Sequence, residues 1–128
     1  MKRIAAYCGL ALVFAWFMFG GIAHFTNAEF FVAIMPPYLP WHLEIVYLSG
    51  VLEIAFAAML VPPATRQLAG NLLIALTIAV TPANIYMWMN PHLFPDVEPL
   101  FLSLRLVVQV ILLAVIWWST RNQTWARA

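Results

Sequence analysis

One carboxylate, Glu53, lies inside an apolar run that extends from Leu43 to Val61. If this run crosses a bilayer as a helix, Glu53 lies about 18 Å along the axis from Trp41, near the middle of a hydrocarbon layer roughly 30 Å thick. A lone ionised carboxylate is costly at that depth, so Glu53 must be protonated, paired or exposed to water. Glu53 is therefore a candidate for ligand binding or proton transfer.

Other polar side chains also interrupt the apolar stretches. They are His24, Ser49, Asn84, Arg105 and Gln109. Ser49 and Glu53 are four residues apart, as are Arg105 and Gln109, so each pair shares one face of a helix. A histidine, a glutamate and an arginine together offer a proton acceptor and hydrogen-bond donors to a carbonyl, and apolar side chains around them would cover an apolar tail. This chemistry suits the head group of a quinone or a similar amphiphile.

A second group of residues could bind a metal. Met87, Met89 and His92 lie close together in the sequence, and thioether and imidazole ligands suit copper. Their spacing matches no strong metal motif, so packing is the favoured interpretation, and copper or axial haem ligation is the alternative. The single cysteine, Cys8, excludes an intramolecular disulfide and a CxxC redox pair. No phosphate-binding loop, nucleophile elbow or soluble catalytic triad is present.

The composition defines the class of protein that carries these residues. The chain has 128 residues, of which 65% are hydrophobic and 9% charged, whereas charged residues reach about 25% in soluble proteins. Its mean hydropathy is +0.91. The sequence therefore predicts an integral membrane protein, with the lipid bilayer as its partner and a single domain over residues 1–128. The basic residues form no patch, so no nucleic-acid partner is expected.

The apolar stretches predict an all-α, four-helix transmembrane bundle. The spans are expected at residues 4–27, 43–61, 67–89 and 100–118. The segment from Ala28 to Met35 is too short to span and is predicted to form a short helix in the membrane interface. The first apolar run reaches Phe25, which exceeds the usual 7–15-residue core of a signal peptide, so we expect it to be retained as a span. Pro82 is expected to kink the third span.

The charged residues predict the orientation. With four spans, one side carries Lys2, Arg3, Arg66, Arg121 and Arg127, and the opposite loops carry Glu29, Glu44, Asp96 and Glu98. By the positive-inside rule, both termini of this membrane protein are predicted to be cytoplasmic.

Counting residues from the outer surface then compares the depths of the polar groups. Arg105 lies roughly 9 Å below Pro99, and Gln109 about one turn deeper, close to the level of Glu53. A long arginine side chain can cover the difference. Glu53 and Arg105 are therefore predicted to form an intramembrane ion pair, with His24, Asn84 and Gln109 around it.

Several stretches of the chain resemble the DoxX-like family of small four-helix bacterial membrane proteins. They are Gly21-Ile22-Ala23-His24-Phe25, Pro36-Pro37-Tyr38-Leu39-Pro40, Ser49-Gly50-Val51-Leu52-Glu53 and Thr81-Pro82-Ala83-Asn84-Ile85-Tyr86-Met87. The resemblance extends from about Gly20 to Arg121. It implies a four-helix bundle in which His24, Glu53 and Asn84 occupy the family's recurrent polar positions. Some relatives are named as membrane subunits of thiosulfate:quinone oxidoreductase or associate with oxidative-stress enzymes, while distant animal relatives act in receptor assembly or cargo trafficking.

Three functions are consistent with these patterns. The first is a small inner-membrane protein whose outward-facing polar pocket binds a quinone or similar amphiphile, as a subunit or accessory of redox enzymes. The second is a non-catalytic assembly protein whose polar cluster holds the helices in register, since each hydrogen bond between membrane helices contributes roughly 0.6–2 kcal/mol. The third is a proton-coupled carrier of a small solute, which would need a homo-oligomer because four spans are few for alternating access.

Overall fold

The computed structural model describes residues 2–33, 35, 37–95 and 98–121, with side chains from residue 4 onward. Asp96 and Arg127, which contribute to the predicted orientation, lie outside these residues. The described chain is all-α: α1 spans Lys2–Thr26, α2 Ala28–Ala33, α3 His42–Met59, α4 Pro63–Met89 and α5 Pro99–Arg121, with a 3₁₀ helix η1 at Pro91–Leu93 between α4 and α5.

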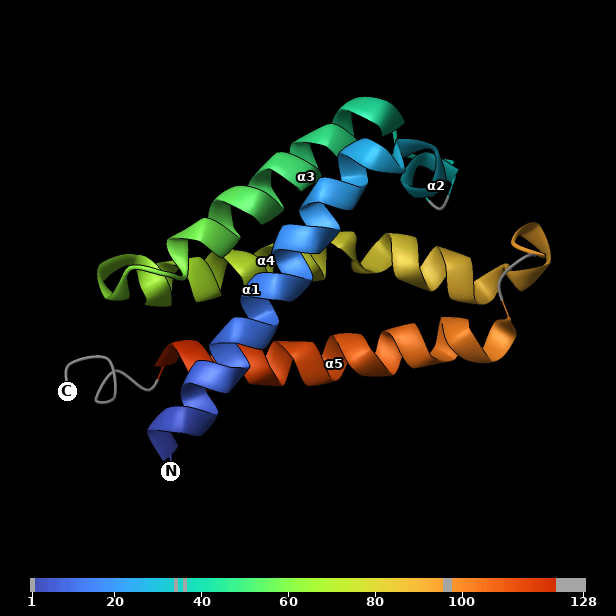
Figure 1. Ribbon diagram of the computed structural model, residues 1–128. Helices are drawn as coiled ribbons and strands as arrows, with labels where there is room; N and C mark the ends of the chain where they lie inside the picture. The colour runs from blue at the N-terminus through green and yellow to red at the C-terminus, as the bar shows by residue number, and fades with distance from the viewer. Residues whose placement is uncertain (1, 34, 36, 96–97, 122–128) are drawn as a thin grey trace.

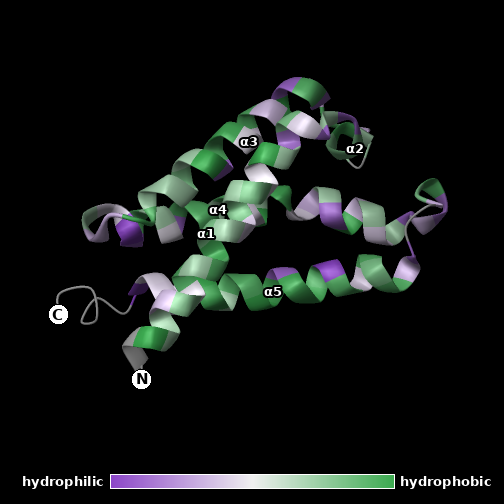
Figure 2. Cartoon of the chain, viewed as in Figure 1, coloured by the Kyte–Doolittle hydropathy of each residue, from purple (hydrophilic) through white to green (hydrophobic). Residues whose placement is uncertain are grey.

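Four of these helices are long and apolar enough to cross a membrane, namely α1 from Ile4, α3, α4 and α5. By the length and composition of these helices, the chain is a multi-pass membrane protein. The predicted four-helix fold and the short helix after the first span are therefore confirmed. Most of α5 is hydrophobic along its length, and its hydrophilic positions in the half nearer η1 lie beside hydrophilic positions of α4 (Figure 2).

The helix boundaries differ from the prediction by a few residues. Helix α4 begins at Pro63 rather than 67, because proline is favoured at the first helical position, where its missing N–H removes no hydrogen bond. Helix α5 continues to Arg121 rather than ending at 118, and α2 ends at Ala33 rather than Met35. Helix α4 is unbroken through Pro82.

The four long helices form two antiparallel pairs, α1 with α3 and α4 with α5 (Figure 1). We call the end that carries α2 and η1 the α2 end, and the end that carries the start of α1 and the α3–α4 turn the terminal end. The two pairs approach each other at the terminal end and diverge towards the α2 end (Figure 1). The pairs are thus splayed apart at the end where the predicted polar residues lie.

The main hydrophobic core holds the pairs together near the terminal end. Its fully buried members include Val13 of α1, Ala57 of α3, Leu73 of α4 and Ile116 of α5. A Cβ added to Gly9 would lie 2.9 Å from the ring of Trp118, so α1 and α5 approach closely there.

The turn between α3 and α4 is braced by Arg66, which is only 6% exposed. Its Nε donates to the carbonyl of Leu60 at 2.8 Å, and its Nη2 donates to the carbonyl of Val61 at 2.7 Å. These carbonyls follow the last turn of α3, where backbone acceptors lack helical partners and a cation is favoured. Arg66 therefore fixes the turn that joins the two helix pairs.

Candidate functional site

Two glycines form the crossing point of α1 and α3. A Cβ added to Gly21 would lie 2.9 Å from the carbonyl oxygen of Gly50, and one added to Gly50 would lie 3.0 Å from the carbonyl oxygen of Gly21. Each glycine also lies under the other helix's polar residue. The added Cβ of Gly50 would be 2.8 Å from Cβ of His24, and that of Gly21 would be 3.2 Å from Cβ of Glu53. The absence of side chains at the crossing therefore brings His24 and Glu53 together.

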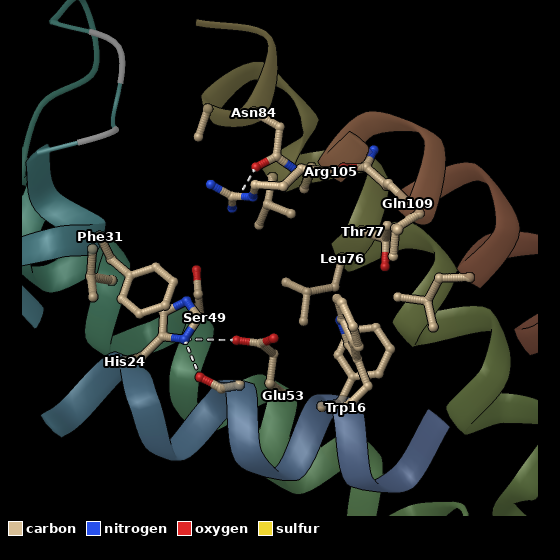
Figure 3. Close-up of a pocket in the computed structure, with 18 of the residues that line it drawn as sticks. Trp16, His24, Phe31, Ser49, Glu53, Leu76, Thr77, Asn84, Arg105 and Gln109 are labelled. Carbon is tan, nitrogen blue, oxygen red and sulfur yellow. Dashed lines mark hydrogen bonds and ion pairs between the residues drawn. The ribbon is translucent and has the colours of Figure 1, made fainter. Parts of the chain in front are cut away.

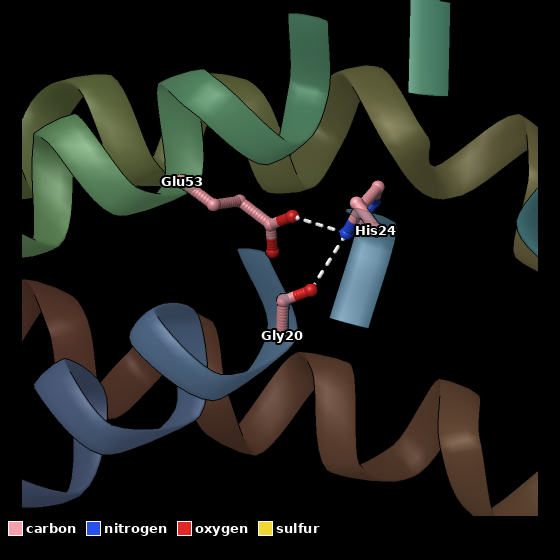
Figure 4. Close-up of polar contacts among 3 residues, drawn as sticks. All are labelled: Gly20, His24 and Glu53. Carbon is pink, nitrogen blue, oxygen red and sulfur yellow. Dashed lines mark hydrogen bonds and ion pairs between the residues drawn. The ribbon is translucent and has the colours of Figure 1, made fainter. Parts of the chain in front are cut away.

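His24 and Glu53 form a close contact at this crossing (Figure 4). Nδ1 of His24 is 3.0 Å from Oε2 of Glu53, and the two side chains are 12% and 13% exposed. The same Nδ1 is 2.7 Å from the carbonyl oxygen of Gly20. Because a carbonyl oxygen only accepts, Nδ1 must carry a proton and donate it. Oε2 of Glu53 is buried and makes no hydrogen bond with the described residues, so its contact with His24 is electrostatic rather than an aligned hydrogen bond.

Helices α4 and α5 are joined differently, by a chain of side-chain hydrogen bonds. Nη2 of Arg105 donates to Oδ1 of Asn84 at 3.1 Å, and Nδ2 of Asn84 donates to Oε1 of Gln109 at 2.5 Å. Nε2 of Gln109 then donates to Oγ1 of Thr81 at 2.5 Å, and Thr81 donates to the carbonyl of Thr77 at 2.8 Å. Every donor in this chain points away from Arg105, so the orientation of both amides is fixed.

The ion pair predicted between Glu53 and Arg105 does not form within the described structure. Glu53 contacts His24, whereas the two hydrogen bonds of Arg105 go to Asn84 and to the sulfur of Met87, the latter at 2.9 Å. The prediction compared depths along the helices and left out the direction in which each side chain points. Contact between α1 and α3 assigns Glu53 to His24, and contact between α4 and α5 assigns Arg105 to Asn84.

These contacts define two polar clusters, His24 with Glu53 on α1 and α3, and Arg105 with Asn84 and Gln109 on α4 and α5. The two clusters face each other across one pocket of about 1050 Å³ (Figure 3). All six residues predicted for the polar cluster line it, namely His24, Ser49, Glu53, Asn84, Arg105 and Gln109. The other lining residues are mostly apolar, including Trp16, Leu76 and Leu112. The volume lies just above the roughly 300–1,000 Å³ found for small-molecule sites, which likewise combine an apolar lining with a few polar groups.

The pocket also has an aromatic contact that the sequence did not indicate. The ring of Phe31 in α2 stacks on His24, with ring centroids 4.0 Å apart and an interplanar angle of 14°. Phe31 also packs against the buried pair Met87 and Leu102 of α4 and α5. The short helix α2 therefore connects the two helix pairs at the α2 end. Three further lining residues, Trp16, Leu76 and Thr77, were not predicted from the sequence. The type of such a residue does not indicate whether its side chain faces lipid, another helix or the pocket.

The residues considered for copper have different surroundings. Met87 is buried and its sulfur accepts a hydrogen bond from Arg105, whereas Met89 is 66% exposed at the end of α4 and His92 is exposed in η1. Among the described residues, no group of three or more His, Cys, Asp or Glu side chains is placed to hold a metal ion.

The comparisons with known proteins concern almost the whole chain. A search of curated proteins and a search of solved structures each find no match. The model of one family, a domain of unknown function (DUF8561), matches residues 9–120. This range includes all of α3 and α4, most of α1 and α5, and every residue of the two polar clusters. The chain therefore belongs to the DUF8561 family.

Proposed function

We propose that this membrane protein binds an amphiphile from the lipid phase, with the head group between the two polar clusters and the apolar tail directed into the bilayer. The observation that carries the proposal is the convergence of six polar residues from four helices on one otherwise apolar pocket. A pocket that only packed helices together would be filled by side chains, as protein interiors are.

The rim of the pocket supports entry from the side. On α1, the lining residues Trp16 and Phe19 are 50% and 72% exposed, and on α5 the lining residues Phe101 and Leu104 are 54% and 48% exposed. In a membrane, such exposed apolar side chains face lipid tails. An amphiphile can therefore reach the polar clusters between α1 and α5 while its tail stays in an apolar environment.

A quinone is the head group that the sequence predicts, with a role as accessory or subunit of a membrane redox system. Its carbonyls would accept hydrogen bonds from Arg105, and its ring would lie beside the aromatic side chains of Phe31 and Trp16. The resemblance to DoxX-like proteins supports the redox role. The carbonyls of a neutral quinone would accept hydrogen bonds in the pocket, but they would not balance the positive charge of Arg105.

Equilibrium binding of decylubiquinone to the purified protein tests the quinone proposal. We expect saturable binding at one site, at least tenfold weaker in Glu53→Gln. Glu44→Gln is the matched control, because Glu44 is an exposed carboxylate in the first turn of the same helix and does not line the pocket. If decylubiquinone does not bind the unmodified chain, the quinone and redox proposal is wrong. Equal loss of decylubiquinone binding in both variants would contradict the location of the binding site in the pocket.

A non-catalytic assembly protein is the second candidate. The observation in its favour is that Asn84, Gln109 and Thr81 satisfy one another's hydrogen bonds without a ligand. On this account the polar residues only maintain the helix register. Glu53→Gln would then change no binding property, and the pocket would take up no amphiphile.

We also propose that the terminal end faces the cytoplasm of a bacterial inner membrane, following the positive-inside rule. Arg66 and Arg121 both lie at the terminal end. In a Cys8→Ser background, a membrane-impermeant maleimide should label Tyr38→Cys in intact cells and label Ala64→Cys only after permeabilisation. Tyr38 lies in the connection between α2 and α3, and Ala64 lies in the first turn of α4, beside the α3–α4 turn at the opposite end; both residues are exposed. The reverse pattern would refute the orientation.

A further inference from the structure

We infer that the head group recognised in the pocket is an anionic oxyacid, a carboxylate or a phosphate monoester on a single apolar chain, and that Arg105 binds it. This inference rests on the proposed function, the binding of an amphiphile from the lipid phase, and it names a charged head group in place of the neutral quinone. It starts from a cation in the membrane-spanning part of α5 whose charge is balanced by no side chain within the described structure.

The described partners of Arg105 are all neutral. Its guanidinium stays protonated, and its hydrogen bonds go to the thioether of Met87 and the amide oxygen of Asn84. The described carboxylate in the pocket, Glu53, is instead held against His24. Charged side chains in membrane spans usually pair with an opposite charge, because an unpaired charge in hydrocarbon is costly. A ligand that brings a negative charge would supply the pair.

The guanidinium also has donors left for a ligand. Arginine has five N–H donors, and the two hydrogen bonds to Met87 and Asn84 leave three. Arg105 lines the pocket, and its guanidinium lies on the side that faces the opposite cluster (Figure 3). Carboxylates and phosphates match the planar guanidinium with two parallel hydrogen bonds, which a single neutral hydroxyl does not.

The hydrogen-bond chain reinforces this choice of charge. Asn84 accepts from Arg105 and donates to Gln109, which donates to Thr81, so each dipole is aligned with the positive charge at its start. Aligned hydrogen bonds polarise one another. The chain therefore holds Arg105 in place and spreads its positive charge without adding a negative one. The oxyacid is expected on this side of the pocket, away from Glu53.

A set of probes with the same tail tests the inference. Laurate, dodecyl phosphate, dodecanol and dodecylamine, each radiolabelled, are titrated at neutral pH against the protein in phosphatidylcholine nanodiscs, whose lipid has no net charge. We expect at least one of the two acids to bind about tenfold or more tightly than dodecanol, and dodecylamine to bind most weakly. Whether laurate or dodecyl phosphate binds better distinguishes a fatty acid from a phosphate lipid as the source.

Variants of Arg105 assign the preference to its charge. Arg105→Gln should remove the preference for acids, so that laurate and dodecyl phosphate bind no more tightly than dodecanol. Arg105→Lys should keep a preference for acids, and it serves as the second variant if Arg105→Gln does not fold. Arg121→Gln is the control, because Arg121 is bonded to Asn71 at the terminal end and does not line the pocket.

The outcomes separate this inference from the proposed function. Equal affinity for all four probes would overturn the anionic head group and leave amphiphile binding intact. A preference for dodecylamine would also overturn it, since Glu53 would then select the head group. Failure of every probe to bind would overturn the anionic head group, and it would overturn the proposed function as well if decylubiquinone also fails to bind. An acid preference that persists in Arg105→Gln would refute the role of Arg105.

Discussion

The two sides of the pocket are built by different means. In the α1/α3 pair, Gly21 and Gly50 bring the backbones into contact. His24 follows Gly21 by three residues, and Glu53 follows Gly50 by three. In the α4/α5 pair, a chain of hydrogen bonds between amide and hydroxyl side chains joins the helices. The first pair is held together by close backbone packing at two glycines, and the second by hydrogen bonds between side chains.

The difference explains which groups remain for a ligand. Close packing at the glycines fixes the positions of His24 and Glu53, but no residue that the structure describes makes an aligned hydrogen bond to Oε2 of Glu53. The hydrogen-bond chain satisfies Asn84 and Gln109 but leaves the charge of Arg105 unbalanced within the described structure. Stability and binding are thus carried by different atoms, and substitutions should separate them.

The largest loss of stability is expected for Gly50→Ala. The new Cβ would lie 2.8 Å from Cβ of His24 and 3.0 Å from the carbonyl oxygen of Gly21, and neither can move without separating the helices. Overpacking of this kind costs about 1–3 kcal/mol, which thermal unfolding in detergent should detect as a lower midpoint.

Gly20→Ala is the matched control for that substitution. Its Cβ would meet only the flexible end of Glu53, at 3.3 Å from Oε1. Because alanine favours a helix over glycine by roughly 0.5–1 kcal/mol, this variant should be as stable as the original chain or slightly more so. Equal destabilisation by both substitutions would contradict the assignment of the crossing to Gly21 and Gly50.

An intermediate effect is expected for Gln109→Leu. The substitution removes the hydrogen bonds to Asn84 and Thr81, and bonds between membrane helices average about 0.6 kcal/mol each. A loss of about 1 kcal/mol should appear in the same unfolding assay. Ser103→Ala, which loses one exposed bond to Trp88, should change stability by less than about 0.5 kcal/mol. An unchanged midpoint for Gln109→Leu would show that the chain of bonds does not hold α4 to α5.

The smallest effect on stability is expected for Glu53→Gln. The amide preserves the size of the side chain, and Oε2 of Glu53 has no aligned hydrogen bond to the described part of the chain. We expect a change within about 0.5 kcal/mol, although binding of decylubiquinone should fall at least tenfold. A destabilisation larger than that of Gln109→Leu would mean that the contact between His24 and Glu53, rather than the glycines, holds α1 to α3.

Much of the fold could be predicted from the sequence because membrane spans have a strong signal. The length and hydropathy of the four apolar runs determined the helices, with boundaries displaced by a few residues where Pro63 initiates α4 and Arg121 ends α5. Depth could also be predicted, since each residue advances a helix by ~1.5 Å. The six polar residues consequently line one pocket.

The partners of these residues could not be obtained from depth. Contact depends on which helices are adjacent and on the direction of each side chain, and these follow from packing. One signal was present, because Gly21 precedes His24 by three residues and Gly50 precedes Glu53 by three. If the helix face that carries Gly21 and His24 packs against the face that carries Gly50 and Glu53, His24 and Glu53 are expected to be in contact. The stacking of Phe31 on His24 had no comparable signal, since phenylalanine in a short helix is equally suited to lipid.

Photo-cross-linking tests the central claim, that an amphiphile enters the pocket between α1 and α5, most directly. A palmitate analogue with a diazirine close to its carboxylate is irradiated with the protein in phosphatidylcholine nanodiscs, and the adducts are mapped by mass spectrometry. We predict labelling at pocket residues such as Phe31, Leu76 and Leu104, reduced by excess palmitate and by Arg105→Gln. Labelling spread evenly over exposed residues outside the pocket, such as Val110 and Ile111, and unaffected by competition would contradict the account.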